Sequence, residues 1–116
     1  MTRKDALAEL IAKVEAGGNP SQAEWVEVFP DTPDDDDYPR SLMATQASVG
    51  WLDAANALHE AVLCAGDPQY GYLVGPMYAR IVHPSCGTVC DAQSHNPARA
   101  WLLSILRALH AMEPSE

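Results

Sequence analysis

The stretch of sequence that decides the fold is NPARAWLLSILRAL, residues 96–109. Asn96 is a residue type that caps helix N-termini, and Pro97 suits the first helical position. Behind them the apolar side chains recur every three or four residues and share one helical face: Trp101, Leu102, Ile105, Leu106, Leu109 and Met112. This spacing predicts an amphipathic helix over residues 97–112 that packs one face against the rest of the protein.

The segment before this helix has a different pattern. From residue 70 onward, YGYLV, MYARIVH and TVCDAQ are short runs rich in aromatic and β-branched residues. Turn-forming residues separate them: Gly75-Pro76 in one case and residues 84–87, PSCG, in the other. Runs of this kind are typical of strands joined by tight turns. We therefore expect three antiparallel strands.

Three more helices are predicted from the N-terminal half. Residues 3–16 have helical spacing and end at Gly17-Gly18, and a shorter helix follows in which Ser21 and Glu24 have the spacing of a capping box. Its expected buried side carries Trp25 and Phe29. A longer helix is predicted over about 48–65, with Leu, Val and Ala on one stripe.

Together these elements predict an α+β fold in one domain, residues 1–116. In this fold a three-stranded antiparallel sheet is packed by two main helices, at about 48–65 and 97–112. The two N-terminal helices close the core. With 116 residues, of which 47% are hydrophobic and 20% charged, the chain has the size and composition of one globular domain.

Between the helical segments lies an acid-rich stretch, PDTPDDDDYPR at residues 30–40, with three prolines and five aspartates. This composition favours neither helix nor strand and predicts a solvated acidic loop at about 30–47. The acids from residue 24 to 37 are interrupted by no base, and we name them as candidate partner-binding residues: Glu24, Glu27, Asp31, Asp34, Asp35, Asp36 and Asp37.

The net charge of −9, from 16 acidic and 7 basic side chains, narrows the choice of partners. A strongly acidic protein repels the phosphate backbone, so direct nucleic-acid binding is disfavoured and a basic protein surface is favoured. We expect no secretory signal, no membrane span and a cytoplasmic location. Three cysteines without regular spacing do not form a disulfide framework and are expected to be reduced.

The segment HPSCGTVCDAQSH, residues 83–95, contains four residue types that bind zinc: His83, Cys86, Cys90 and His95. Structural zinc sites draw their ligands from two separate elements, whereas these four fall within thirteen residues. If residues 84–87 form a turn, Cys90 lies in the returning strand and His95 beyond it. We interpret the segment as a plain hairpin without a metal, with a zinc site as the alternative.

No catalytic residue or cofactor is predicted, and we expect a protein that is not an enzyme. His59 precedes Cys64 by five residues, so on an α-helix the two side chains would point to different sides and form no dyad. No glycine-rich phosphate-binding motif is present. The tryptophans Trp25, Trp51 and Trp101 fall on predicted helices, where core or interface positions are expected.

The order of elements, and the closing helix NPARAWLLSILRAL in particular, resembles the small phage and prophage proteins grouped as phage ABA sandwich domains. WLDAANALHEAVL, residues 51–63, is similar to their alanine-rich helix, and the resemblance covers about residues 3–110. It implies a short antiparallel sheet between helices and supplies no catalytic residues. The acidic loop and the clustered cysteines depart from the pattern.

Two functions follow as hypotheses. In the first, the protein is a phage or mobile-element inhibitor that uses its acids in place of phosphate charge on a basic surface of a host defence complex, in the manner of anti-CRISPR proteins. In the second, it is an accessory or structural phage protein in which Trp51, the tyrosines of the sheet and helix faces form a homo- or hetero-oligomeric interface, for example a homodimer.

Overall fold

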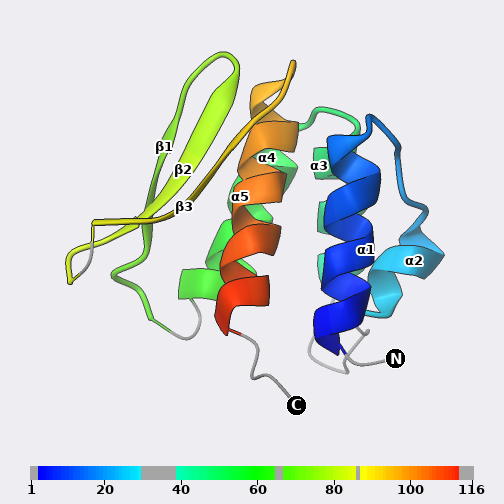
Figure 1. Cartoon of the computed structure of the whole chain (residues 1–116), viewed down its shortest axis with the longest axis horizontal. Coiled ribbons are helices and arrows are strands. Elements are labelled where there is room, and N and C mark those ends of the chain that lie inside the picture. Colours follow the sequence, from blue (N-terminus) through cyan, green and yellow to red (C-terminus); the bar gives the residue numbers. More distant parts are fainter. Residues whose placement is uncertain (1–2, 30–38, 65–66, 86, 113–116) are drawn as a thin grey trace.

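Helix α5 (Pro97–Met112) lies between the sheet and helix α1 (Arg3–Glu15), and helix α4 (Leu52–His59) lies behind it (Figure 1). The computed structural model describes residues 3–29, 39–64, 67–85 and 87–112. The side chain of Asn96 caps α5, since its Oδ1 accepts hydrogen bonds from the backbone N–H of Ala98 at 2.8 Å and of Arg99 at 3.3 Å. Ten of the 16 residues of α5 are buried, Trp101 and Leu106 among them. The predicted bounds of this helix are confirmed.

The sheet contains β1 (Gly71–Val74), β2 (Tyr78–His83) and β3 (Gly87–Gln93) in the order β1-β2-β3, with both pairs antiparallel. Ala79, Ile81 and Ala92 are buried against α5, so one face of the sheet joins the core. The β2–β3 pairing shifts register between Ile81 and Val82. The predicted α+β fold with three antiparallel strands is thereby confirmed.

The N-terminal helices are α1 (Arg3–Glu15) and α2 (Gln22–Val26). Helix α1 packs along α5 (Figure 1). It ends where the backbone of Gly17 adopts a φ of +90°, a conformation that glycine allows at helix C-termini. The predicted capping box at the start of α2 is present, and Trp25 and Phe29 are buried as expected.

The acidic loop was predicted to extend to residue 47, and this boundary is wrong. Residues 40–48 form helix α3 (Arg40–Ser48), which begins after Pro39 in an extended conformation. The buried residues of α3 are small: Ser41, Ala44, Ala47 and Ser48. Because this helix packs through alanine and serine, it lacks the stripe of large apolar residues by which helices are found in a sequence. Residues 30–38 lie outside the described residues.

The segment predicted to form one long helix over 48–65 contains the end of α3, a turn and two further helical elements instead. Helix α3 ends at Ser48, and α4 (Leu52–His59) begins after a turn in which Gly50 has a φ of +107°. The π-helix η1 (Glu60–Cys64) continues α4. The buried apolar residues of these elements, among them Ala47, Leu58 and Leu63, belong to one core. None of the helices in the described ranges is long and apolar enough to cross a membrane.

Candidate interaction site

The predicted acidic patch begins on α2, where the structure describes Glu24 and Glu27. Glu24 is already engaged within the molecule, because its carboxylate forms an ion pair with Lys13 of α1 and accepts the backbone N–H of Ser21 at 2.8 Å. The hydrogen bond from Lys13, and then that from Ser21, lowers the pKa of Glu24. Glu27 is exposed. Of these two acids, Glu27 is the better placed to meet a partner.

The remaining acids of the patch lie outside the described residues: Asp31, Asp34, Asp35, Asp36 and Asp37. The structure does place the two ends of the segment that carries them, at Phe29 and Pro39. A cavity of about 430 Å³ is lined by Phe29 together with Arg3 and Arg40. The Nε–H of Arg3 donates to the Val28 carbonyl at 3.2 Å. Two arginines, Arg3 and Arg40, therefore line a cavity next to Phe29.

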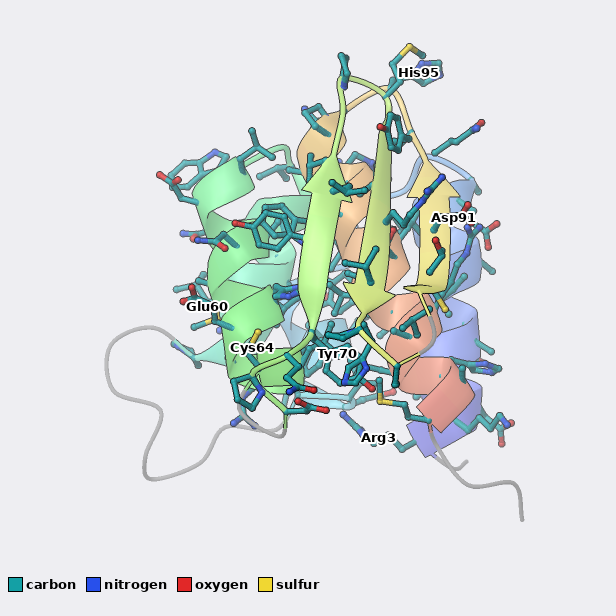
Figure 2. The ribbon with its side chains drawn as sticks, turned by 90° about the vertical axis from the view of Figure 1, so that its left-hand side faces the viewer. Arg3, Glu60, Cys64, Tyr70, Asp91 and His95 are labelled. Atoms are coloured by element: carbon teal, nitrogen blue, oxygen red, sulfur yellow. The ribbon has the colours of Figure 1, made fainter. Side chains whose placement is uncertain are left out.

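The cysteine–histidine segment forms the β2–β3 hairpin. His83 ends β2 opposite Gly87, Cys90 lies within β3, and His95 follows the far end of β3. At about 3.3 Å per residue, the distance along the strand from Gly87 to His95 is roughly 25 Å. Figure 2 shows His95 at one end of the sheet. His83 and His95 are therefore too far apart to bind one metal ion, and Cys86 lies outside the described residues.

The described part of the chain contains no group of three or more His, Cys, Asp or Glu side chains arranged to hold a metal. Cys90 is partly buried against the core, and burial raises the pKa of its thiol. Its position is the one expected for a small apolar residue in a strand that faces α5. The hairpin predicted for this segment is confirmed.

His83 is held by residues of the adjoining turns. Its Nδ1 accepts the backbone N–H of Ser85 at 3.1 Å and lies 2.7 Å from the Ser85 hydroxyl, while its Nε2 lies 2.8 Å from the Asp67 carboxylate. Since Nδ1 accepts the backbone N–H, the ring proton is on Nε2 and is donated to Asp67. The pKa of Asp67 is lowered by the N–H of Gln69 and then by His83.

Serine, histidine and aspartate in a hydrogen-bonded series also occur where a histidine activates a serine nucleophile. Such a nucleophile needs oxyanion donors and a cavity for its substrate as well. Three cavities of the molecule, of about 510, 480 and 430 Å³, are lined by residues other than Asp67, His83 and Ser85. The series Asp67, His83 and Ser85 joins the end of the hairpin to the turn after η1.

His59 and Cys64 lie on the same side of their helix, which corrects the prediction that they point to different sides. The Nε2–H of His59 and the Sγ–H of Cys64 both reach the carbonyl of Tyr70, each over 3.3 Å. The cause is η1, because a π-helix has more residues per turn than an α-helix and places residues five apart on the same side. Figure 2 shows Cys64 and Tyr70 near each other at the lower end of this helix.

The pair is nevertheless not an activated thiol. His59 donates its Nε2 proton to Tyr70, and its Nδ1 accepts the indole N–H of Trp101 at 3.4 Å, so neither ring nitrogen is available to deprotonate Cys64. Burial raises the pKa of Cys64 and lowers that of His59. Both shifts favour the neutral forms, whereas a catalytic cysteine requires a thiolate.

A surface of exposed apolar residues lies where α3 meets α4. The sequence analysis named only one of its residues, Trp51. Val49, Trp51 and Leu52 are 57%, 58% and 43% exposed, and we call these three residues the α3–α4 apolar surface. Trp25 and Trp101, by contrast, are buried in the core. Large apolar side chains that are exposed together are a feature of surfaces that bind other proteins.

Arg99 is a structural residue that the sequence analysis did not single out. Its two terminal nitrogens donate to the carbonyls of Val14, Gly18 and Ser48 and to the side-chain oxygen of Asn19. These contacts join α5 to the C-terminal ends of α1 and α3, where helix dipoles favour a cation. Burial lowers the pKa of Arg99. No local pattern reveals these acceptors, because they lie about 50 to 85 residues away in the chain.

A cavity of about 510 Å³ adjoins Arg99, and a second of about 480 Å³ lies next to it, with Gln93, Ser94 and His95 lining both. The N–H groups of Arg99 that the structure records as donors are directed to protein oxygens. The guanidinium of Arg99 thus serves the fold.

Comparison of the chain with protein-family models, with curated proteins and with solved structures finds no match. The resemblance to phage ABA sandwich domains therefore stays a prediction that rests on the order of elements and on the sequence of α5.

Proposed function

We propose that the protein is a non-enzymatic inhibitor, encoded by a phage or another mobile element, that binds a basic nucleic-acid-binding surface of a host defence complex in the manner of anti-CRISPR proteins. It acts in the cytoplasm of the bacterial host and uses its acidic side chains in place of phosphate charge, without a cofactor. One observation carries this proposal: the acids and bases of the chain are unevenly distributed.

Between Glu15 and Arg80 the only Lys or Arg is Arg40. The same part of the chain contains these acids: Glu24, Glu27, Asp31, Asp34, Asp35, Asp36, Asp37, Asp53, Glu60 and Asp67. Asp53 and Glu60 are exposed on α4 and η1, and Figure 2 shows Glu60 on the outer side of that helix. A surface with one sign of charge attracts partners of the other sign and raises their rate of association.

The basic side chains outside this part of the chain do little to offset it, because several are engaged locally. Lys13 pairs with Glu24, and Arg107 pairs with Glu15 at 2.9 Å. Arg99 is directed to backbone and amide oxygens. Between Glu15 and Arg80 the sequence therefore has ten acids and one base, and Lys13, Arg99 and Arg107 are engaged with other groups.

The test is a competition assay with a purified CRISPR effector complex and its labelled target DNA. The account predicts that the protein displaces the DNA, and that displacement weakens steeply as the salt rises from about 0.05 M to about 0.3 M. Changing Asp34, Asp35, Asp36 and Asp37 together to asparagine is expected to weaken displacement by about tenfold or more.

A matched pair of single substitutions controls for the loss of charge itself. Glu27→Gln removes one exposed acid from the proposed site, and Asp91→Asn removes one exposed acid from β3 (Figure 2). We expect Glu27→Gln to weaken displacement more than Asp91→Asn does. Undiminished displacement by the fourfold asparagine variant removes the acidic segment from the mechanism, and no displacement by the native protein at either salt concentration removes the function.

A second candidate function is that of an accessory interaction protein of a phage particle, which the α3–α4 apolar surface favours. There the partner would cover Trp51, which is 58% exposed. Binding through this surface is expected to respond little to salt and to be weakened by Trp51→Ala. Inhibition through the acids is expected to weaken as salt rises and to be unaffected by Trp51→Ala. Binding assays at two salt concentrations with both variants separate the two candidates.

A further inference from the structure

The two edges of the sheet differ in how they are protected. On the β3 edge, an Nη–H of Arg107 donates to the carbonyl of Asp91 at 2.7 Å, and Arg107 also pairs with Glu15. A charged side chain that occupies the edge of a sheet hinders pairing with another strand. On the β1 edge, no backbone bond other than those to β2 joins Tyr72 or Val74 to the rest of the described chain, although the ring of Tyr72 packs against His59 and Trp101.

The register decides which backbone groups of β1 point outward. The N–H of Gly75 donates to the carbonyl of Tyr78 at 2.8 Å, so these two residues form a hydrogen-bonded pair at the end of the hairpin. Such pairs alternate along an antiparallel ladder, which makes Leu73 and Arg80 the next hydrogen-bonded pair. Tyr72 and Val74 therefore direct their N–H and C=O groups away from β2, toward the open edge.

The segment that carries this edge contains no charged residue, although the molecule as a whole is strongly acidic. Residues 68–79, PQYGYLVGPMYA, contain no Asp, Glu, Lys or Arg, although the chain as a whole carries a charge of −9. Two side chains of β1 are exposed, Tyr72 by 46% and Leu73 by 52%. A second copy of the chain carries the same net charge, so two copies repel each other less at an uncharged edge than at the acidic surface.

We propose that two copies of this chain associate by pairing β1 with β1 of the partner subunit, antiparallel, about a two-fold axis at Leu73. Tyr72 then exchanges backbone hydrogen bonds with Val74 of the partner subunit. Leu73 packs against Leu73 of the partner subunit, and the two sheets become one continuous sheet. An isologous contact of this kind closes on itself and leaves the acidic surface of each copy free. The inference does not depend on the proposed function.

The first measurement is the mass of the full-length protein by light scattering after size-exclusion chromatography, over a range of concentrations and at two salt concentrations. We expect twice the mass of one chain, with a dimer that tightens as salt rises, because salt screens the repulsion between two acidic copies. A native protein that stays monomeric up to about millimolar concentration overturns the proposal.

Substitutions then locate the contact. Leu73→Lys places like charges opposite each other at the two-fold axis, and Val74→Pro removes an outward N–H without removing a bond to β2. Each is expected to weaken the dimer by about tenfold or more. Val49→Lys is the matched control, since Val49 is 57% exposed at the C-terminal end of α3, and it should leave the dimer intact. Equal dimerisation by all three variants overturns the proposal.

A covalent test does not depend on how well the variants fold. Non-hydrogen-bonded residues opposite each other in an antiparallel pair have Cα atoms about 4.5 Å apart, which is within the range of a disulfide. We therefore expect the Leu73→Cys variant to form a disulfide between two chains in the presence of oxidised glutathione. Val49→Cys and the native chain, which has three cysteines, provide the background. Cross-linking of Leu73→Cys no greater than this background contradicts the geometry.

Discussion

The indole N–H of Trp101 donates to Nδ1 of His59 over 3.4 Å, which joins α5 to α4 inside the core. The same imidazole donates its Nε2 proton to the carbonyl of Tyr70, just before β1. His59 thus connects three elements, and it does so as a neutral ring, because Nδ1 can accept the indole N–H only while it carries no proton. Burial favours the neutral ring, because it lowers the pKa of His59 from its ordinary 6.5.

The stability of the protein is therefore expected to fall between about pH 7.5 and pH 5. A histidine whose pKa is lower in the folded than in the unfolded state stabilises the fold fully above the unfolded value near 6.5. That contribution is lost as pH falls toward the lower folded value, because the unfolded chain then binds the extra proton. Urea denaturation followed by circular dichroism at several pH values in this range measures the effect.

The control for this prediction is His59→Gln, which retains polar groups but does not titrate. The variant is expected to be less stable at pH 7.5 and to show a flatter dependence on pH than the native protein. Identical pH profiles for the two proteins would mean that His59 is not the titrating group. The carboxylates with lowered pKa, Glu24 and Asp67, titrate below this range and do not interfere.

Arg99→Ala is expected to lower the free energy of unfolding by about 2–4 kcal/mol, because it leaves carbonyls at the ends of two helices without their cationic donor. Arg99→Lys should recover part of the loss, since one ammonium cannot reach all four oxygens. Arg107→Ala, which removes a partly exposed ion pair with Glu15 and one hydrogen bond to the Asp91 carbonyl, should cost less, about 1 kcal/mol. Urea denaturation ranks the three variants, and a loss for Arg107→Ala as large as for Arg99→Ala contradicts the role given to Arg99.

Gly50 is expected to tolerate no side chain. Its φ is +107°, and a Cβ at this position would lie 2.9 Å from the side-chain nitrogen of Asn96, the cap of α5. Gly50→Ala should therefore destabilise the protein by about 1–3 kcal/mol. Gly17 has a φ of +90° but open space around it, so Gly17→Ala isolates the backbone strain and should cost less. Equal losses in thermal or urea unfolding would show that Asn96 adds nothing.

The thiols of Cys64 and Cys90 are expected to react slowly with iodoacetamide at pH 7.5. Burial raises the pKa of both, which lowers the fraction present as thiolate. Mass spectrometry of the alkylated protein assigns the modified residue, with free glutathione as the reference thiol. Alkylation of Cys64 faster than the reference would mean that His59 activates it after all.

The parts of the fold that the sequence predicts well are those whose signal is local. The cap and apolar stripe of α5 lie within one segment, and the three strands are marked by their own turns. Helix α3 was missed because its buried residues are alanine and serine. The alignment of His59 with Cys64 depends on a π-helix, which no residue pattern in the sequence identifies.

The candidate site was predictable to a lesser extent. The acids from residue 24 to 37 are plain in the sequence, yet Lys13, which pairs with Glu24, is 11 residues away and could be assigned only from the packing of α1 and α2. Trp51, which follows the turn at Gly50, is likewise exposed, whereas Trp25 and Trp101 are buried. Such relationships arise from tertiary packing and leave no local signal.

The most direct test of the proposed function is affinity capture with the tagged full-length protein from a bacterial lysate that contains active CRISPR effectors. The column is washed at low and then at high salt, and the bound proteins are identified by mass spectrometry. The account predicts that a nucleic-acid-binding effector is retained at low salt and released at high salt, and that the fourfold asparagine variant of residues 34–37 retains much less of it. Recovery of virion proteins alone, or of nothing but the protein itself, would contradict the account.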